Sequence, residues 1–206
     1  MGSQGAERAK PRWNEPVAAM KRDAILAAAR AVFEEHGLDQ ASMRVIAARA
    51  GCTTGAVYPL FASKEHIYAA LLEQSLAALH ERVAAAHARA RVRPHEAAAK
   101  AFAGYYLERP YEVNLGLYAF DGLKRLGVGK ESDRTLNDAL AATVRLLSPR
   151  PPKTRSAAPD AGAMAVFAQL IGMLVLHLSG RLTLGNAGPA EILNQFFIQQ
   201  RAAQQE

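Results

Sequence analysis

The side chains best suited to chemistry in this sequence lie in one short segment, residues 42–65. Arg44 and Lys64 can pair with phosphate, and Arg44 can also reach a guanine edge. Thr54 and Tyr58 lie between them and can contact base edges, a thymine methyl group or phosphate. A row of outward polar groups of this kind is typical of a surface that binds DNA, and a purely structural segment would not need it.

The sequence shows no arrangement typical of a catalytic or metal site. Residues 127–130 hint at a phosphate-binding loop, but Lys124 stands where its first glycine is required and Glu131 where Ser or Thr is required. His95 begins a zinc-protease pattern that Ala99 leaves without its second histidine. We therefore expect no catalytic residues, no metal site and no cofactor, and we do not expect the protein to be an enzyme.

Two short helices separated by a turn are predicted for the segment that carries this row. Ser42 can cap the first helix by accepting a backbone N–H, and Gly51 can end it in a left-handed conformation. Val45 and Ile46 are expected to face inward from this helix. Thr53 is the capping residue expected for the second helix.

The second helix, about residues 54–60, is expected to be anchored through Val57 and Phe61. The residues then left facing outward are Thr54, Gly55 and Tyr58. Ser63 can cap a third helix, which places the Lys64 ammonium beside free backbone N–H groups at a positive helix end, an arrangement that suits a phosphate. The segment therefore predicts a helix-turn-helix followed by a third helix.

Further spaced residues extend this pattern back to a first helix that begins before Ile25. In chain order the characteristic positions are Ile25, Ala28, Phe33, Gly37, Ser42, Met43, Ile46, Ala47, Ala50, Gly51, Gly55, Tyr58, Phe61, Ser63, Lys64 and Glu65. Together they resemble the DNA-binding domain of TetR/AcrR-type transcriptional regulators. Pro59 departs from that pattern, because the family often carries a phosphate-contacting residue there and proline lacks the N–H donor.

The resemblance implies a sequence-specific DNA-binding regulator, a repressor released from a pseudo-palindromic operator by a small apolar or amphipathic ligand. The residues that it implies for DNA binding are Arg44, Thr53, Thr54, Gly55, Tyr58 and Lys64. Two alternatives remain open. One is a ligand-independent or activating regulator, and the other is a helical small-molecule carrier or enzyme that retains the helix-turn-helix only as a structural fold.

Composition indicates an all-α protein, because alanine is abundant and no segment alternates in the manner of a strand. The net charge of +6 gives only weak support for a nucleic-acid partner, since residues 1–80 hold nearly equal numbers of basic and acidic side chains. A single cysteine excludes an internal disulfide, and the N-terminus lacks a signal-peptide core, so we expect a cytoplasmic protein. The apolar run 166–178 is the one membrane candidate. Even extended back to Ala161 it reaches only about 18 residues, the lower limit for a span, and it contains Gln169 and His177, so it is expected to be a buried helix.

We expect a flexible arm over residues 1–14, a three-helix DNA-binding domain over 15–66, and a larger helical ligand-binding and dimerisation domain over 67–206. A proline-rich linker over 148–159 is expected to be mobile. The larger domain should contain helices from Lys64 past Ala86, from Pro94 to Arg109, from Pro110 to Leu123 or Leu126, from Ser132 or Asp133, from Asp160 to about Leu184, and from Pro189.

The larger domain also carries aromatic, amide and thioether groups that could line a ligand cavity. The candidates are Phe102, Tyr106, Tyr118, Gln169, Met173 and His177, with core or interface packing as the alternative for each. The helix from Asp160 is apolar around most of its circumference and must bury a second face. We therefore predict a homodimer through residues 160–204, which the family resemblance also implies.

Overall fold

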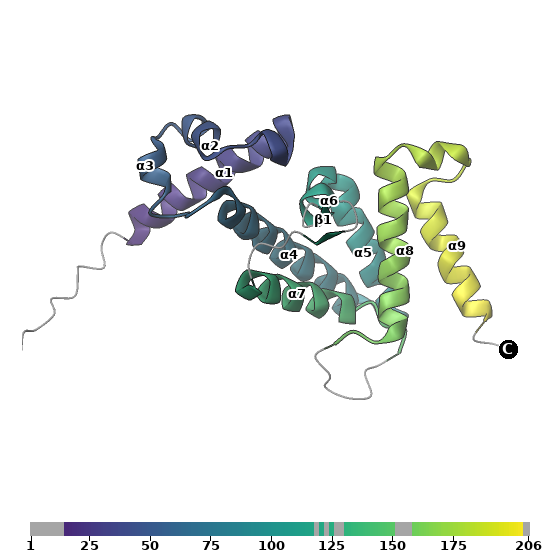
Figure 1. Ribbon diagram of the computed structural model, residues 1–206. Coiled ribbons are helices and arrows are strands. Elements are labelled where there is room, and N and C mark those ends of the chain that lie inside the picture. Colours follow the sequence, from purple (N-terminus) through teal and green to yellow (C-terminus); the bar gives the residue numbers. More distant parts are fainter. Residues whose placement is uncertain (1–14, 118–119, 122–123, 126–129, 151–157, 204–206) are drawn as a thin grey trace, which may run out of the picture. The chain divides into compact units, whose positions relative to one another are not determined.

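The computed structural model in Figure 1 describes residues 15–117, 120–121, 124–125, 130–150 and 158–203 of the 206-residue chain. Apart from a two-residue antiparallel ladder, the regular structure in these ranges is helical, which confirms the all-α prediction. The chain divides into two compact units, one ending at Ile67 and the other beginning at Tyr68. The arm expected over residues 1–14 lies outside the described residues.

The first unit is built on α1, with α2 and α3 packed beside one another. Their bounds are α1 (Glu15–Gln40), α2 (Met43–Arg49) and α3 (Thr54–Val57). Gly37 interrupts α1 as predicted, with φ of 73° and ψ of 168°, a conformation that glycine adopts without a Cβ clash. The helices α1 and α2 are in contact. Val32 and Phe33 of α1 and Ile46 of α2 are buried. An ion pair between Arg49 and Glu35 joins the two helices at the surface.

The second unit begins along α4 and continues through two further helices in the predicted places. These are α4 (Lys64–Arg89), α5 (Pro94–Glu108) and α6 (Pro110–Leu117). The prediction that α6 would reach Leu123 or Leu126 is wrong. It ends one residue after Gly116, a poor helix former, and is followed by the antiparallel pair β1 (Phe120–Asp121) and β2 (Lys124–Arg125).

The remaining elements are α7 (Lys130–Arg145), α8 (Ala161–Leu178), the 3-10 helix η2 (Arg181–Leu184) and α9 (Pro189–Ala202). Of these, α7 and α8 differ from prediction at an end, whereas α9 begins at Pro189 as predicted. Glu131 and Asp133 lie inside the first turn of α7, where acidic groups favour the helix dipole, so neither Ser132 nor Asp133 is the cap. Asp160 caps α8 as predicted, and its Oδ1 accepts the Ala163 N–H at 2.7 Å.

The C-terminal end of α8 lies at Leu178 because Gly180 takes a left-handed conformation, with φ of 71°. The predicted continuation to Leu184 is therefore wrong, and the chain turns through η2 instead. Of the predicted linker, residues 151–157 lie outside the described part of the chain. At its start, the Ser148 hydroxyl donates to Asp160 Oδ2 at 2.6 Å. This bond holds the pKa of Asp160 below its ordinary value.

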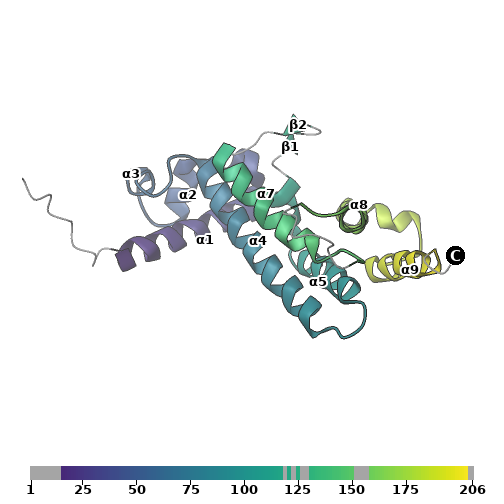
Figure 2. The same ribbon diagram turned by 90° about the horizontal axis from the view of Figure 1, so that it is seen from below.

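The core of the second unit lies between α5 and α8, which pack against each other and against α9 (Figures 1 and 2). Phe102 of α5 is fully buried and meets Phe167 of α8 edge to face, with ring centroids 5.9 Å apart. On α8 the buried side chains are Ala163, Val166, Leu170, Met173 and Leu174. By length and composition α8 is also a candidate membrane span. It contacts α5, α7 and α9, but only 28% of its residues are buried, so the helix that was expected to be buried is only partly covered in the described chain.

A histidine at the α5–α9 contact makes stability depend on pH. His95 is half-buried against Phe197, with ring centroids 6.0 Å apart, and burial lowers the pKa of its imidazole below the usual 6.5. The folded state therefore favours the neutral ring. The stabilisation of the folded state by the neutral ring is complete above about pH 6.5. It is lost as the pH falls towards the pKa of His95 in the folded state.

We expect the thermal midpoint to fall between pH 7.5 and 5.5, and to fall less in His95→Phe, which keeps the aromatic contact without a titrating group. Circular dichroism melts of both proteins at the two pH values measure this. Equal losses in the two proteins would exclude His95 as a source of the pH dependence.

Candidate nucleic-acid interface

The start and end of α2 follow the predicted local chemistry. Ser42 is extended, with φ of −133° and ψ of 157°, and its Oγ accepts the Val45 N–H at 3.3 Å. Gly51 is left-handed, with φ of 69°. Val45 was expected to face inward but is 37% exposed, because a seven-residue helix buries only a narrow stripe and Ile46 with Ala47 fills it.

The second helix is shorter than predicted. Thr53 occupies the N-cap position in an extended conformation, although its side chain makes no capping hydrogen bond in the described structure. Helical bonding covers Thr54–Val57 and then relaxes into a turn in which the Leu60 and Phe61 N–H groups both donate to the Val57 carbonyl at 2.9 Å. Pro59 explains the change, since it has no N–H to continue the helix.

Burial of Val57 and Phe61 turns the opposite side of α3 towards solvent. Val57 is fully buried and Phe61 is 3% exposed, whereas Tyr58 is 54% exposed. Gly55, Thr53 and Arg44 are also exposed, and Thr54 is half-buried. The structure thus brings Thr53, Gly55 and Tyr58 to one exposed stretch around α3, with Arg44 on the preceding helix.

Packing within the protein does not require glycine at position 55. A Cβ built there would meet only Thr53 Oγ1, at 3.7 Å, which is an ordinary van der Waals contact. The backbone of Gly55 lies in the helical region, so no unusual φ demands glycine either. The glycine leaves α3 with bare backbone on its exposed side, where another molecule could approach closely.

The first turn of α4 carries the second group of candidate contacts. Ser63 provides the carbonyl for the first helical bond, from Ile67 N at 3.3 Å. Lys64 Nζ donates to the Ala41 carbonyl at 3.4 Å, which directs the ammonium towards the start of α2 and leaves two of its three donors for another acceptor. A hydrogen bond from Ser63 lowers the pKa of Glu65, so an ionised carboxylate lies next to Lys64.

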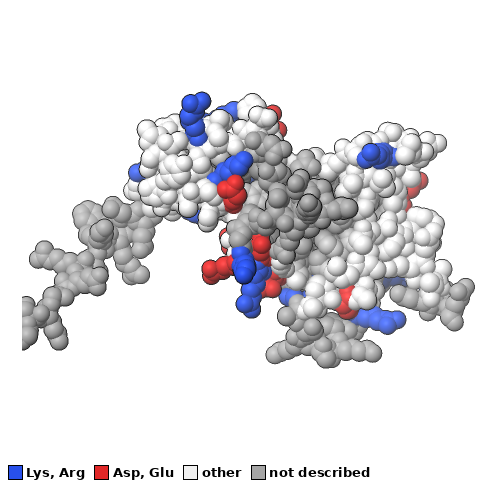
Figure 3. Space-filling view, viewed as in Figure 1, with Lys and Arg blue, Asp and Glu red and all other residues white. Residues whose placement is uncertain are grey.

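Charged side chains are dispersed on one face of the described structure. On the face drawn in Figure 3, Lys and Arg are scattered among uncharged and acidic residues and do not merge into one basic surface. Arg49 is engaged by Glu35, and the Arg22 guanidinium lies 4.9 Å above the Phe61 ring. Sequence reasoning did not single out Arg22, because its partner is 39 positions away and only the fold brings the two together. On this face, affinity for an anion therefore depends on positioned contacts rather than on a general basic field.

Residues 25–71 match the sequence profile of the family described as bacterial regulatory proteins, tetR family. This match confirms the predicted resemblance to the tetR family for the N-terminal segment of the chain. The chain is 37% identical over 65 residues to the HTH-type transcriptional repressor AcnR of Corynebacterium diphtheriae, a match that covers 32% of this chain. The matched part is about a third of the length of that relative, 34%.

Solved structures extend the likeness to most of the chain at the level of fold. The crystal structure of SCO4313 covers 90% of this chain and 96% of its own, with a TM-score of 0.71 and 19% identity. The SmeT–triclosan complex covers 80% of this chain and 81% of its own, with a TM-score of 0.56 and 22% identity. The predicted architecture, an N-terminal helix-turn-helix unit and a larger helical unit, is confirmed.

The candidate ligand residues fall into different environments. Phe102 and Tyr106 pack edge to face with centroids 5.1 Å apart, and Met173 is also buried. Burial raises the pKa of the Tyr106 hydroxyl well above its ordinary value. Gln169 is half-buried and His177 is exposed at the end of α8, while Tyr118 lies outside the described residues. The described structure therefore groups Phe102 and Tyr106, and His177 does not join them.

Sequence reasoning did not identify Glu112 as a buried partner of Ser75. Glu112 and Ser75 are 4% and 2% exposed and hydrogen-bond to each other, although they come from different helices. A glutamate in the first turn of a helix gives no sign of burial in the sequence. Among the described residues, no group of three or more His, Cys, Asp or Glu side chains could hold a metal ion.

Proposed function

We propose that this protein is a sequence-specific DNA-binding transcriptional regulator of the cytoplasm, a repressor that a small ligand releases from its operator. The observation that carries the proposal is the exposed side of α3. Val57 and Phe61 anchor the segment, while Gly55 and Tyr58 face solvent without any internal role in the described structure. The similarity to AcnR, described as a repressor, supports the direction of regulation.

In this proposal α3 enters the major groove. Thr54 and Tyr58 contact base edges, a thymine methyl group or phosphate, and Gly55 lets the helix backbone come close to the groove. Arg44 reaches a guanine or the backbone from α2, and Thr53 lies at the edge of the same surface. Lys64 holds a phosphate with its two remaining donors and the free N–H groups of the first turn of α4.

A second copy of the chain is proposed to cover the outer face of α8 and α9. Met164, Val175 and Leu176 on α8 are 46%, 40% and 42% exposed, and Ile198 on α9 is 50% exposed. An isologous contact of these two helices would bury them in a four-helix arrangement. Two α3 helices related by the dimer axis then require a pseudo-palindromic operator, with half-sites about one helical turn apart.

The ligand is proposed to be apolar or amphipathic and to bind within the second unit. Buried aromatic groups on α5 and the apolar face of α8 suit such a molecule, with Phe102, Tyr106, Tyr118, Gln169, Met173 and His177 as candidate contacts. SmeT, which shares the fold, was crystallised with triclosan, a small aromatic molecule. Screening the protein by thermal shift against aromatic compounds, and then testing hits for release of DNA, addresses this part separately.

Selection of genomic DNA fragments by the purified protein tests DNA binding itself. The informative variant is Gly55→Ala, because alanine fits the folded structure and improves helix propensity by up to about 1 kcal/mol. We expect its thermal midpoint to stay equal or rise while operator affinity falls by about tenfold, since the added methyl group separates α3 from the groove.

A matched control is Gly116→Ala, a helical glycine of α6 at which a Cβ would meet no atom within 4 Å. It should leave DNA affinity unchanged. Recovery of no enriched fragment by the wild-type protein, or equal affinities of wild type and Gly55→Ala, would contradict the proposed use of α3.

A further inference from the structure

One stripe of α4 carries three polar contacts at seven-residue intervals, at Tyr68, Ser75 and Arg82. We call these contacts and their partners the polar seam. The Tyr68 hydroxyl donates to the Leu115 carbonyl, and the Ser75 hydroxyl donates to Glu112 Oε2 at 2.5 Å. The Arg82 guanidinium forms a two-pronged ion pair with Glu108, with both N–O distances at 2.6 Å.

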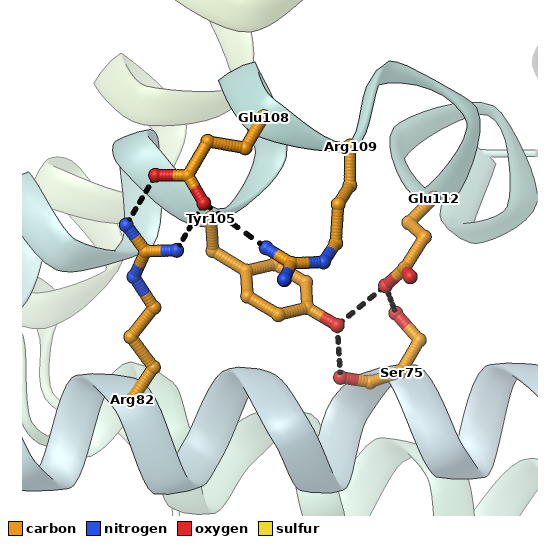
Figure 4. A network of polar contacts seen from close by, with 6 residues as sticks. All are labelled: Ser75, Arg82, Tyr105, Glu108, Arg109 and Glu112. Atoms are coloured by element: carbon orange, nitrogen blue, oxygen red, sulfur yellow. Dashed lines mark hydrogen bonds and ion pairs between the residues drawn. The ribbon is translucent and has the colours of Figure 1, made fainter.

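The middle contact of the polar seam is buried and joins three helices. Tyr105 adds a second donor to Glu112 Oε2 at 2.5 Å, and its hydroxyl also lies 3.1 Å from the Ser75 carbonyl (Figure 4). Burial, together with the hydrogen bond to Glu112, raises the pKa of Tyr105 to about 12, so the phenol stays protonated. Three side chains from α4, α5 and α6 therefore meet at one carboxylate oxygen.

At the Arg82 end of the polar seam, α4 and α5 pack closely around the guanidinium. Gly104 of α5 faces it, and a Cβ there would lie 3.2 Å from Arg82 Nη2, so glycine makes room for the guanidinium. Glu108 also receives Arg109, at 3.2 Å, and Arg109 in turn lies 4.6 Å above the Tyr105 ring (Figure 4). The turn between α5 and α6 is thus connected to α4 at two successive points of its stripe.

The partners of the polar seam run along α5 and α6 in the opposite direction to α4. Moving from Tyr68 to Ser75 to Arg82, the partners go from Leu115 to Glu112 to Glu108. Successive contacts on α4 are about 10.5 Å apart along its axis. A shift of one helical turn, about 5.4 Å, would break all three together, and the buried Tyr68 and Ser75 hydroxyls would lose their acceptors.

We propose that the polar seam fixes the register of α4 against α5 and α6, and that Ser75, Tyr105 and Glu112 are positioning residues for the DNA-contacting first turn of α4. Apolar contacts are non-directional and tolerate sliding, whereas a polar contact at a heptad position specifies one register. The neighbouring residues Leu71, Leu72 and Leu79 already bury apolar surface. The polar groups therefore fix the relative position of the helices and add little buried apolar area. The inference rests on the proposed function, because it concerns how α4 positions Lys64, a proposed DNA contact.

The test compares seam variants with a variant of another polar contact of α4. The seam variants are Ser75→Ala and Tyr68→Phe, which each remove one hydroxyl. The control is Thr143→Val, which removes the contact between Thr143 Oγ1 of α7 and His80 Nδ1 of α4, 3.1 Å apart and outside the seam. Three quantities are measured for each protein: the thermal midpoint, the affinity for the selected operator, and hydrogen exchange of the α4 amides in the free protein.

Loosening the seam lets α4 populate other registers, so only a fraction of molecules matches the fixed spacing of an operator. We expect each seam variant to lower operator affinity by about fivefold or more, and to raise exchange along α4 from Tyr68 to Arg82 as one unit. Thr143→Val should lower the thermal midpoint by a similar amount and leave operator affinity within about twofold of wild type.

Affinity that simply follows the thermal midpoint in all three variants would overturn the proposal. Exchange that rises only beside the altered residue would overturn it as well, because the seam would then not act as a unit. If the wild-type protein selects no DNA, the proposed function fails, and the exchange measurement still decides whether the seam holds α4 in register.

Discussion

Leu176→Glu is expected to convert the protein into a monomer that binds its operator about 100-fold or more weakly than the wild-type dimer. Leu176 is 42% exposed in the single chain, on the α8 face that we propose a second copy covers. A glutamate on that face would be buried without a partner in the dimer, yet solvated in the monomer. Because the second DNA-binding unit of a dimer binds intramolecularly, losing it removes most of the operator affinity.

Ile198→Glu on α9 should behave in the same way, since Ile198 is 50% exposed. Phe197, its neighbour in the sequence, is unsuitable for this test, because it is 1% exposed inside the chain and packs on His95. A charge there would unfold α9 whether or not a dimer forms. Val92→Glu supplies the control, since Val92 is 75% exposed in the turn between α4 and α5.

Sedimentation velocity and electrophoretic mobility shift together measure this expectation. The control should sediment as wild type and bind DNA normally. A wild-type protein that sediments as a monomer at micromolar concentration would contradict the dimer. Retention of the dimer by both Leu176→Glu and Ile198→Glu would place the interface elsewhere.

Short-range chemistry explains which parts of the fold were predictable. The capping serine at position 42, the left-handed Gly51 and the prolines at positions 94 and 189 each act on residues within one turn, and the helices begin or end there. Gly180 belongs to the same class and marks the end of α8. The predicted helix continued past Gly180 because apolar residues recur at Leu182 and Leu184.

Features that depend on distant partners were not predictable from one sequence. Val45 faces solvent because Ile46 and Ala47 alone fill the narrow contact with α1, and the width of that contact is a tertiary property. Burial of Glu112 depends on Ser75, which is 37 residues away. No local pattern in the sequence indicates which carboxylate accepts the Ser75 hydroxyl.

The proposed DNA contacts differ in how firmly the structure holds them. Tyr58 is exposed and Lys64 is directed by its bond to the Ala41 carbonyl, so Lys64 is the better-defined probe. Glu65 beside it is ionised, which reduces the local positive charge. A phosphate at this place would therefore depend on the Lys64 ammonium more strongly than in a basic surface where neighbouring cations could substitute.

Lys64→Ala is accordingly expected to weaken binding to every DNA sequence by a similar factor, and to reduce the slope of log affinity against log salt by about 0.9 for each phosphate that the protein no longer neutralises. A dimer carries Lys64 twice, so the slope should fall by about two units, and the decrease in affinity should be largest at low salt. Lys100→Ala is the matched control, because it removes the same charge from an exposed position on α5. Fluorescence anisotropy of a labelled operator and of a scrambled duplex, each at several salt concentrations, separates the two variants. If Lys64→Ala matches Lys100→Ala in both slope and affinity, the first turn of α4 does not hold a phosphate. The contacts to the DNA phosphate backbone must then come from residues on other elements.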